Sequence, residues 1–279
     1  MPKYFNTNCN WTDLAAARQS LSAMGNVISA KGIPGPSAKA AICKNPAYDC
    51  KGKGNVLRAV TDRAAALLPP TLSPSPPPLP LAYTAASSQS CIVFAFTGAG
   101  NVTKGAREMF ELLPHEYITS RDLPGLRDQI RNGERSSRKV YGVLVTLNKL
   151  VRLKVNSTLQ VSVEAGEDTI VDKAHYYANP DLYEPIFHTL IAPYVTVVVN
   201  GIYWDNRYPR ILTKAQLRSL NQTGNSNLKV IADITCDVGG SFEFLSHTTS
   251  IEKPFFTYLS DTDEDVEGAD RKGILMLGV

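Results

Sequence analysis

The sequence predicts an α/β protein whose strands form a parallel sheet. The apolar run 92–96 is short and rich in β-branched and aromatic residues, which is typical of a strand buried on both faces. Further strand patterns alternate with helical patterns through residues 91–279, as in proteins with a parallel sheet. Ligands bind at the carboxyl ends of such strands, and polar segments follow the expected strands there. These segments are 97–103, 119–121, 200–207 and 235–241.

Composition limits the classes of protein that fit. A chain of 279 residues, 43% hydrophobic, can bury one large core or two ordinary ones. The net charge of +3 is too mild to indicate a nucleic acid or a membrane surface as partner. The sequence contains no apolar run of the length that spans a membrane and no apolar signal core, so we expect a cytoplasmic location, with the mitochondrial matrix as the alternative. The five scattered cysteines predict reduced thiols and no metal site.

The first 90 residues read as two segments ahead of the main domain. Residues 12–30 have the apolar spacing of one helix, which the glycine and proline residues of 32–36 end, so 1–36 is an N-terminal helical segment. Residues 37–90 include seven prolines between Pro69 and Pro80 and predict a disordered insertion rich in Pro, Ala and Ser. A proline-rich ligand for a binding partner is the alternative, and 57–68 fits a short helix. The main domain is then 91–279.

A glycine turn follows the first strand. Gly98-Ala99-Gly100 leads into a helical pattern that begins near Asn101. Strand, glycine turn and helix form the arrangement that holds a dinucleotide pyrophosphate, because glycine permits a tight turn and a helix N-terminus offers free N–H groups. Thr103 stands where the usual third glycine would fall, so a purely structural turn is the alternative.

The second expected strand, 116–118, ends in Thr119-Ser120-Arg121. In a Rossmann unit the end of the second strand faces the adenosine ribose, where an acid favours NAD and a hydroxyl or arginine favours NADP. Ser120 and Arg121 therefore indicate NADP(H), and a solvated loop arginine is the alternative. The remaining expected elements are strands at 141–145, 194–199 and 229–234, an extended stretch at 150–170, one helix at 180–190, and a helix at 214–220 capped by Thr213.

Two aspartates lie at and just beyond the strand 229–234. Asp233 and Asp237 can orient a ribose, an amine or a nicotinamide, and turn chemistry is the alternative. Trp204, Asp205 and Arg207 can form the wall of a polar pocket or an exposed loop. His115, His175 and His188 lie outside the inferred cleft, and His247 alone is near it.

Four long stretches carry a resemblance to a known family. They are FTGAGNVTKGAREMFELLPHEYI, YEPIFHTLIAPYVTVVVNGIYWDNRYPRILT, DITCDVGGSFEFLSHTTSIEKPFF and DVEGADRKGILMLGV. They resemble the lysine-ketoglutarate reductase region of bifunctional aminoadipic semialdehyde synthase, a family related to alanine dehydrogenase and transhydrogenase. The resemblance covers nearly all of 91–279, and 14–34 resembles the helix that precedes the glycine turn in that family. Residues 37–90 interrupt the match, so we expect a fragment that carries an insertion.

The resemblance implies a Rossmann-like, doubly wound sheet and the NADPH-dependent reductive condensation of L-lysine and 2-oxoglutarate to saccharopine. Asp237, in the Asp-x-Gly-Gly pattern that this family shares, is the expected catalytic residue, orienting substrate or nicotinamide. Gly98 to Val102 would hold the pyrophosphate, and Asn200 and Gly201 would border the nicotinamide. The expected cofactor-binding residues are Gly98, Ala99, Gly100, Asn101, Val102, Ser120, Arg121, Asn200, Gly201, Asp233 and Gly239.

The resemblance also implies partners. Related enzymes take an acid–base lysine and histidine from a preceding substrate domain, and this chain begins after that domain. We therefore expect the cofactor-binding part of an enzyme, with 1–36 as the remnant of the connection to a separate or missing substrate domain. A saccharopine dehydrogenase domain is a further expected partner. The alternative is a catalytically silent nucleotide-binding or regulatory module.

Overall fold

A computed structural model describes residues 91–111, 113–136, 139–154, 171–224, 226–250, 253, 255–268 and 273–278. The predictions for the segments 1–36 and 37–90 lie outside the described residues, as does most of the extended stretch predicted at 150–170.

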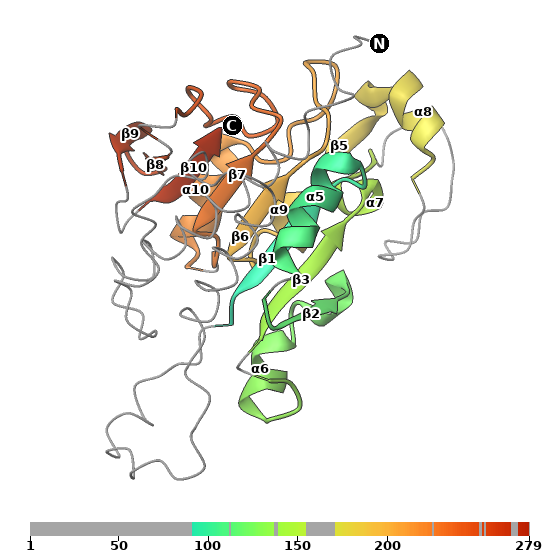
Figure 1. Cartoon of the computed structure of the whole chain (residues 1–279). Helices are drawn as coiled ribbons and strands as arrows, with labels where there is room; N and C mark the ends of the chain where they lie inside the picture. Colours follow the sequence, from blue (N-terminus) through green and yellow to red (C-terminus); the bar gives the residue numbers. More distant parts are fainter. Residues whose placement is uncertain are drawn as a thin grey trace, which may run out of the picture.

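The centre of the fold is an eight-stranded, mostly parallel sheet (Figure 1). Its parallel strands are β1 (Val93–Thr97), β2 (His115–Ile118), β3 (Val140–Val145), β6 (Val197–Asn200), β7 (Val230–Asp233) and β10 (Ile274–Gly278). Two antiparallel strands, β8 (Phe256–Leu259) and β9 (Glu264–Glu267), extend one edge. The order across the sheet is β2-β3-β1-β6-β7-β10-β8-β9, which confirms the predicted α/β class and parallel sheet.

Helices connect these strands on both faces. They are α5 (Asn101–Phe110), α6 (Leu126–Arg131), α7 (Leu147–Leu150), α8 (Lys173–Ala178), α9 (Phe187–Leu190) and α10 (Lys214–Gln222). Thr213 caps α10 as predicted, because its hydroxyl accepts a hydrogen bond from the Gln216 N–H at 3.2 Å while the Gln216 side chain accepts one from the Thr213 N–H at 2.9 Å.

The direction of each connection explains which face its helix covers. The chain passes from β1 to β2 in one direction along the sheet and returns from β2 to β3, then on to β6 and β7, in the other. Crossovers between parallel strands are right-handed, so a reversal of direction moves the helix to the opposite face. Phe110 of α5 accordingly packs with one cluster, whereas Leu126, Phe187 and Leu217 of α6, α9 and α10 pack with the other.

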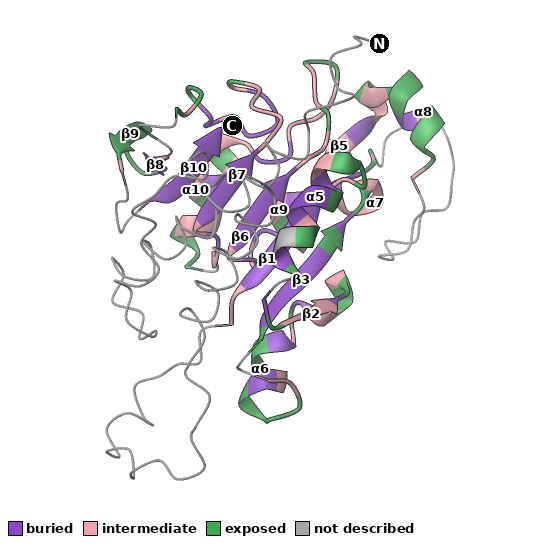
Figure 2. Cartoon of the chain, in the orientation of Figure 1, coloured by how far each residue is buried: buried purple, intermediate pink, exposed green. Residues whose placement is uncertain are grey.

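The core is formed by both faces of the central strands. Every residue of β1 is buried, with Val93 and Ala95 in one cluster and Phe94 and Phe96 in the other. Figure 2 shows the central strands mostly buried, whereas β9 at the edge is exposed. This burial on both faces is what the continuous apolar run of the sequence predicts.

The prediction of one helix at 180–190 is wrong. That segment contains the 3₁₀ turn η4 (Pro180–Leu182), the strand β5 (Tyr183–Pro185) and the short helix α9. β5 pairs antiparallel with β4 (Val151–Leu153) in a separate two-stranded sheet. Pro185 has no N–H to donate and disfavours a helical conformation at Glu184, so a continuous helix cannot form there. The strands β8, β9 and β10 were not predicted.

Candidate functional site

Three polar residues lie side by side at the carboxyl edge of the sheet. Thr97 ends β1, Asn200 ends β6 and Asp233 ends β7; in the strand register Thr97 lies opposite Asn200, and Asn200 lies opposite Asp233. All three side chains have no exposed surface. We call Thr97, Asn200 and Asp233 the edge row, and its members must satisfy one another because water does not reach them.

The hydrogen bonds of the edge row have a fixed direction. The Thr97 hydroxyl donates to Asn200 Oδ1 at 2.5 Å, and Asn200 Nδ2 donates to Asp233 Oδ1 at 2.8 Å and to Ser241 Oγ at 3.1 Å. A carboxylate only accepts, so the amino group of Asn200 has to face Asp233 and its carbonyl oxygen has to face Thr97. The Gly201 N–H donates to the Thr97 hydroxyl at 3.3 Å, which connects the row to the turn that follows β6.

Asp233 is surrounded by donors. The Thr235 hydroxyl donates to Asp233 Oδ1 at 2.6 Å, and the Thr235 N–H donates to the same oxygen at 3.2 Å. The Ser241 hydroxyl donates to Asp233 Oδ2 at 3.3 Å. Burial raises the pKa of Asp233, and the hydrogen bonds from Thr235 and Asn200 act in the opposite direction. Asn200, Thr235 and Ser241 all donate to Asp233, and these hydrogen bonds favour the ionised carboxylate against the effect of burial. The contact of Asp233 with a cofactor stays a prediction. In the structure Asp233 lies beneath the surface, where its hydrogen bonds hold the ends of β6 and β7 together.

The glycine turn after β1 has the backbone that its sequence requires. Gly98 has φ +85°, a left-handed conformation that favours glycine, and its N–H donates to Val145 O at 3.2 Å. A side chain on Gly98 would have its Cβ 3.2 Å from Gly201 O, so the turns after β1 and β6 lie in close contact. Ala99, Gly100 and Asn101 are exposed, and α5 begins at Asn101. An open turn at the start of a helix is suited to an anionic group.

Thr103 replaces the third glycine with a specific contact. Its hydroxyl donates to Thr97 O at 2.8 Å, and the residue is 3% exposed. Thr103 therefore ties α5 to the end of β1 through a side chain.

The loop after β7 comes close to the loop after β6. Asp237 is half-buried, and its pKa is raised first by burial and then by the negative charges of Asp233 and Asp205. Arg210 connects the two loops, because its Nε and its terminal amino group donate to Gly239 O at 3.2 and 3.0 Å. Gly239 has φ +61°, which suits glycine. The structure thus brings Asp237 and Gly239 to the same edge as the glycine turn.

Exposed polar and aromatic groups border this edge. Arg207 makes a two-point contact with Asp205, with Nε to Oδ1 at 3.0 Å and a terminal nitrogen to Oδ2 at 2.7 Å. Tyr203 is 68% exposed and donates its hydroxyl to Asp205 at 3.1 Å. Tyr203 was not singled out from the sequence, where a tyrosine between two strand patterns carries no distinct signal.

The predicted residues Ser120 and Arg121 lie at the same edge of the sheet but two strands away from β1. They form the 3₁₀ turn η3 (Ser120–Asp122) after β2, and β3 separates β2 from β1. In the usual Rossmann order the second strand is the neighbour of the first; here β3 occupies that place. The contact of Ser120 and Arg121 with a 2′-phosphate stays a prediction.

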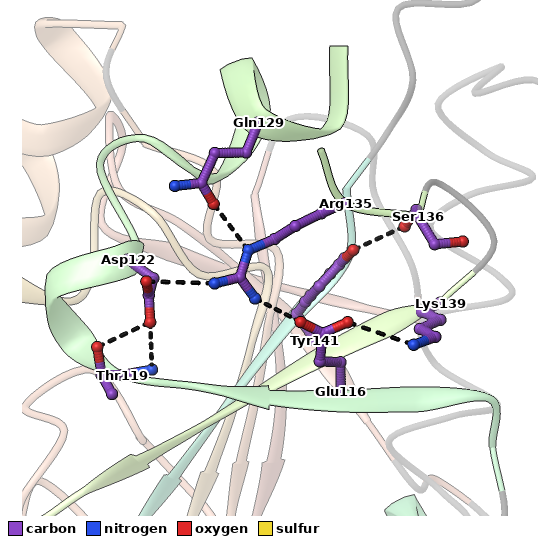
Figure 3. A network of polar contacts seen from close by, with 8 residues as sticks. All are labelled: Glu116, Thr119, Asp122, Gln129, Arg135, Ser136, Lys139 and Tyr141. Atoms are coloured by element: carbon purple, nitrogen blue, oxygen red, sulfur yellow. Dashed lines mark hydrogen bonds and ion pairs between the residues drawn. The ribbon is translucent and has the colours of Figure 1, made fainter. Parts of the chain in front are cut away.

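A polar network holds the chain around the end of β2 (Figure 3). Arg135 contacts Glu116 at 2.5 Å and Asp122 at 3.2 Å, and it donates to Gln129 at 2.7 Å. Asp122 also accepts from the N–H and the hydroxyl of Thr119, both at 2.8 Å. The hydrogen bonds from Thr119, followed by the charge of Arg135, lower the pKa of Asp122. Glu116 and Asp122 are therefore both engaged in structural contacts.

The four histidines belong to different parts of the fold: β2, α8, α9 and the loop after β7. His247 is exposed, stacks on Phe256 with 4.2 Å between ring centroids and lies 2.7 Å from Ser246 Oγ. His188 lines a cavity of about 890 Å³ with Cys91, at the opposite edge of the sheet. Within the described ranges, no group of three or more His, Cys, Asp or Glu residues is arranged to hold a metal ion.

The parallel sheet, its helices on both faces and the open glycine turn define an α/β protein of the doubly wound class, and no protein-family model matches the chain. Curated proteins of similar sequence do match the chain. Alpha-aminoadipic semialdehyde synthase from Arabidopsis thaliana is 40% identical over 194 residues, which cover 67% of this chain and 17% of the relative. The mitochondrial enzyme of the same name from Bos taurus is 32% identical over 287 residues (96% of this chain, 27% of the relative), and that from Mus musculus is 36% identical over 202 residues (67% and 20%).

The chain belongs to the alpha-aminoadipic semialdehyde synthase family, which confirms the resemblance read from the sequence. It spans between 17% and 27% of the length of these relatives. In the part of the chain that the structure describes, no helix is both long and apolar enough to cross a membrane.

Proposed function

We propose that this chain is the NADP(H)-binding part of a lysine-ketoglutarate reductase, which condenses L-lysine with 2-oxoglutarate and reduces the product to saccharopine. The observation that carries the proposal is the contact of Gly98 with Gly201 at the ends of β1 and β6, beside the start of α5. The chain leaves β1 for β2 on one side of it and later passes to β6 on the other side, so the direction of the connections reverses about β1. A crevice for a dinucleotide forms at such a point.

The residues at this edge suit a dinucleotide. Ala99, Gly100 and Asn101 are exposed at the turn, and a Cβ on Gly100 would meet no atom within 4 Å, so a pyrophosphate has room to approach the backbone between Gly98 and Val102. NADPH held at this turn would supply the hydride that reduces the imine of the two substrates.

The chain's own residues orient and border that chemistry. Asn200, fixed by Thr97 and Asp233, holds the Gly201 turn beside the nicotinamide. Asp237 is half-buried near Asp205 and orients the substrate amine, since a carboxylate pairs with an ammonium group. The acid and base that move protons belong to a substrate domain outside the described residues. A saccharopine dehydrogenase domain would use the product.

The names of two relatives reported above include the word mitochondrial. This supports the mitochondrial matrix over the cytoplasm as the location of this protein. Fractionation of cells that express the full-length gene product would test that assignment.

Binding and turnover test the proposal separately. The full chain is titrated with NADPH and with NADH by nucleotide fluorescence, and turnover is then assayed with lysine and 2-oxoglutarate, with and without the substrate domain of a relative. We expect NADPH binding by the chain alone and turnover only when the domain is added, because general acid–base catalysis is worth on the order of 10²–10⁴ in rate. Binding without turnover in either mixture would favour a silent nucleotide-binding module, and no binding would contradict the proposal.

A further inference from the structure

The two strands that flank β1 define where the halves of a dinucleotide can lie. In the register, Thr97 pairs with Val145 of β3 on one side and with Asn200 of β6 on the other. The Gly98 N–H also donates to Val145 O at 3.2 Å. The residue after β3, Thr146, therefore lies level with the glycine turn, in the way that Gly201 does on the other side.

A dinucleotide that crosses the end of the first strand places one half over each neighbouring strand. If the nicotinamide lies beside Gly201, the adenosine lies over the end of β3. Adjacent strands are about 4.8 Å apart, so the end of β3 is roughly 5 Å from the end of β1 and the end of β2 is roughly 10 Å away. The sequence analysis placed the ribose at the end of β2, which is thus one strand farther from β1 than the expected position of the adenosine.

The side chains after β3 have the chemistry that a phosphate requires. Residues 146–150 read Thr-Leu-Asn-Lys-Leu and contain a hydroxyl, an amide and an ammonium group but no acid. Thr146 is exposed, and Asn148 and Lys149 are half-buried. The Thr146 hydroxyl donates to the Asn148 side chain, which holds the two side chains together. An acid at this place would favour the 2′-hydroxyl of NADH, whereas a cation with neutral donors favours the 2′-phosphate of NADPH.

The polar residues at the end of β2 make structural contacts with one another. Arg135 there is engaged by Glu116, Asp122 and Gln129, and these contacts fix the turn that contains Ser120 and Arg121 (Figure 3). The network combines two acids with Arg135 and, through Glu116, with Lys139 at 3.3 Å. The charges of these four residues balance, so the network itself adds no net positive charge beside Arg121.

We infer that the 2′-phosphate of NADPH is recognised at the end of β3 by Thr146, Asn148 and Lys149, and that Ser120 and Arg121 at the end of β2 do not select the cofactor. This inference rests on the proposed function, because it specifies where the proposed NADP(H) site distinguishes its cofactor from NADH.

Two matched variants test the inference. Lys149→Gln and Arg121→Gln each remove one positive charge, and the dissociation constants of NADPH and NADH are measured for both by fluorescence titration of the full chain. Lys149→Gln should weaken NADPH binding on the order of tenfold and leave NADH binding within about twofold, since one charge-assisted hydrogen bond to the phosphate is lost. Arg121→Gln should leave the ratio of the two constants unchanged.

A conservative variant separates recognition from folding. Lys149→Arg keeps the charge and should keep the preference for NADPH. Thr146→Asp should move the preference toward NADH, because a carboxylate repels the 2′-phosphate and accepts from the 2′-hydroxyl. A selective loss of NADPH binding in Arg121→Gln, or an unchanged preference in Lys149→Gln and Thr146→Asp, would overturn the inference while the proposed function stands. Failure of the unaltered chain to bind either nucleotide would overturn both.

Discussion

The buried edge row makes Asn200→Asp the most informative single substitution. The change keeps the size of the side chain and the acceptor that faces Thr97, but it replaces the amino group that donates to Asp233 at 2.8 Å and to Ser241 at 3.1 Å. A second carboxylate then lies against the first where neither has exposed surface. Two carboxylates in such contact cannot both ionise, so one of them takes up a proton at neutral pH.

The expected cost follows from the bonds that are lost. A hydrogen bond to a charged group contributes about 1.5–3 kcal/mol to stability and a neutral one about 1 kcal/mol. Loss of both predicts a fall of roughly 3 kcal/mol in the free energy of unfolding at pH 7. The cost should shrink as the pH falls, because the variant takes up a proton when it folds and this uptake costs less free energy at lower pH.

The assay is equilibrium unfolding in urea at pH 7 and pH 5, with Asn132→Asp as the matched control. Asn132 also donates to a carboxylate, that of Glu134 at 3.4 Å, but it is exposed. Water screens the new charge there, so the control should change stability by less than about 0.5 kcal/mol. Equal effects of the two substitutions at pH 7, or a cost for Asn200→Asp that grows at pH 5, would refute the reasoning.

Three further outcomes are expected. Gly98→Ala and Gly133→Ala both place alanine at positive φ, +85° and +78°, at about 1–2 kcal/mol each, but Gly98→Ala alone should weaken NADPH binding, as titration would show. The raised pKa of Asp237 means that its stabilising contribution is present below the ordinary aspartate value and is lost as pH rises through the raised one, so the gain in melting temperature of Asp237→Asn over the parent should grow with pH. Gly201→Ala brings a Cβ to 2.7 Å from the Thr103 hydroxyl and should cost about 1–3 kcal/mol, and the same substitution should cost less in a Thr103→Ala background, as urea unfolding would measure.

The sequence predicts the central strands well because their signal is local. Burial on both faces requires a continuous apolar run, and β1, β6 and β7 each have one. The cap of α10 is likewise encoded within four residues, Thr213 to Gln216. The helix predicted at 180–190 failed because pairing of Tyr183–Pro185 with Val151–Leu153 depends on residues some 30 positions away, which local spacing does not reveal.

Strand order is a further part of the fold that the sequence did not predict. A second strand usually lies beside the first, but β3 offers the longer apolar surface, with Tyr141, Val143 and Val145 buried, whereas three of the four residues of β2 are only half-buried. Placing the more apolar strand inside the sheet and the shorter, more polar one at its edge buries more apolar surface. The residues that follow each strand move with it, so the choice of edge strand decides which side chains lie near the glycine turn.

Of the edge row, Asn200 and Asp233 were predicted, whereas Thr97 and the residues that hydrogen-bond to the row could not be. Asn200 and Asp233 were recognisable as polar residues at the ends of apolar runs, but Thr97, Thr235 and Ser241 are residue types that occur in most turns. Only the fold shows that the hydroxyl groups of Thr235 and Ser241 converge on the buried carboxylate of Asp233, while that of Thr97 donates to Asn200.

Thr103 shows how an apparent departure from a motif can be part of the site. The third glycine of the usual pattern lets a helix pack closely on its strand. Thr103 instead reaches the strand with its hydroxyl, 2.8 Å from Thr97 O, and it occupies the space that a side chain on residue 201 would need. The close approach that the third glycine usually permits is provided here by Gly201, which follows the neighbouring strand β6. Gly201 leaves room for Thr103, and Thr103 fixes the start of α5 against β1. Because the Gly201 N–H donates to the Thr97 hydroxyl, the glycine turn, the helix and the edge row are held as one unit. A motif search that scores each glycine separately undervalues this arrangement, since the close approach it requires is shared between two strands 103 residues apart in the sequence.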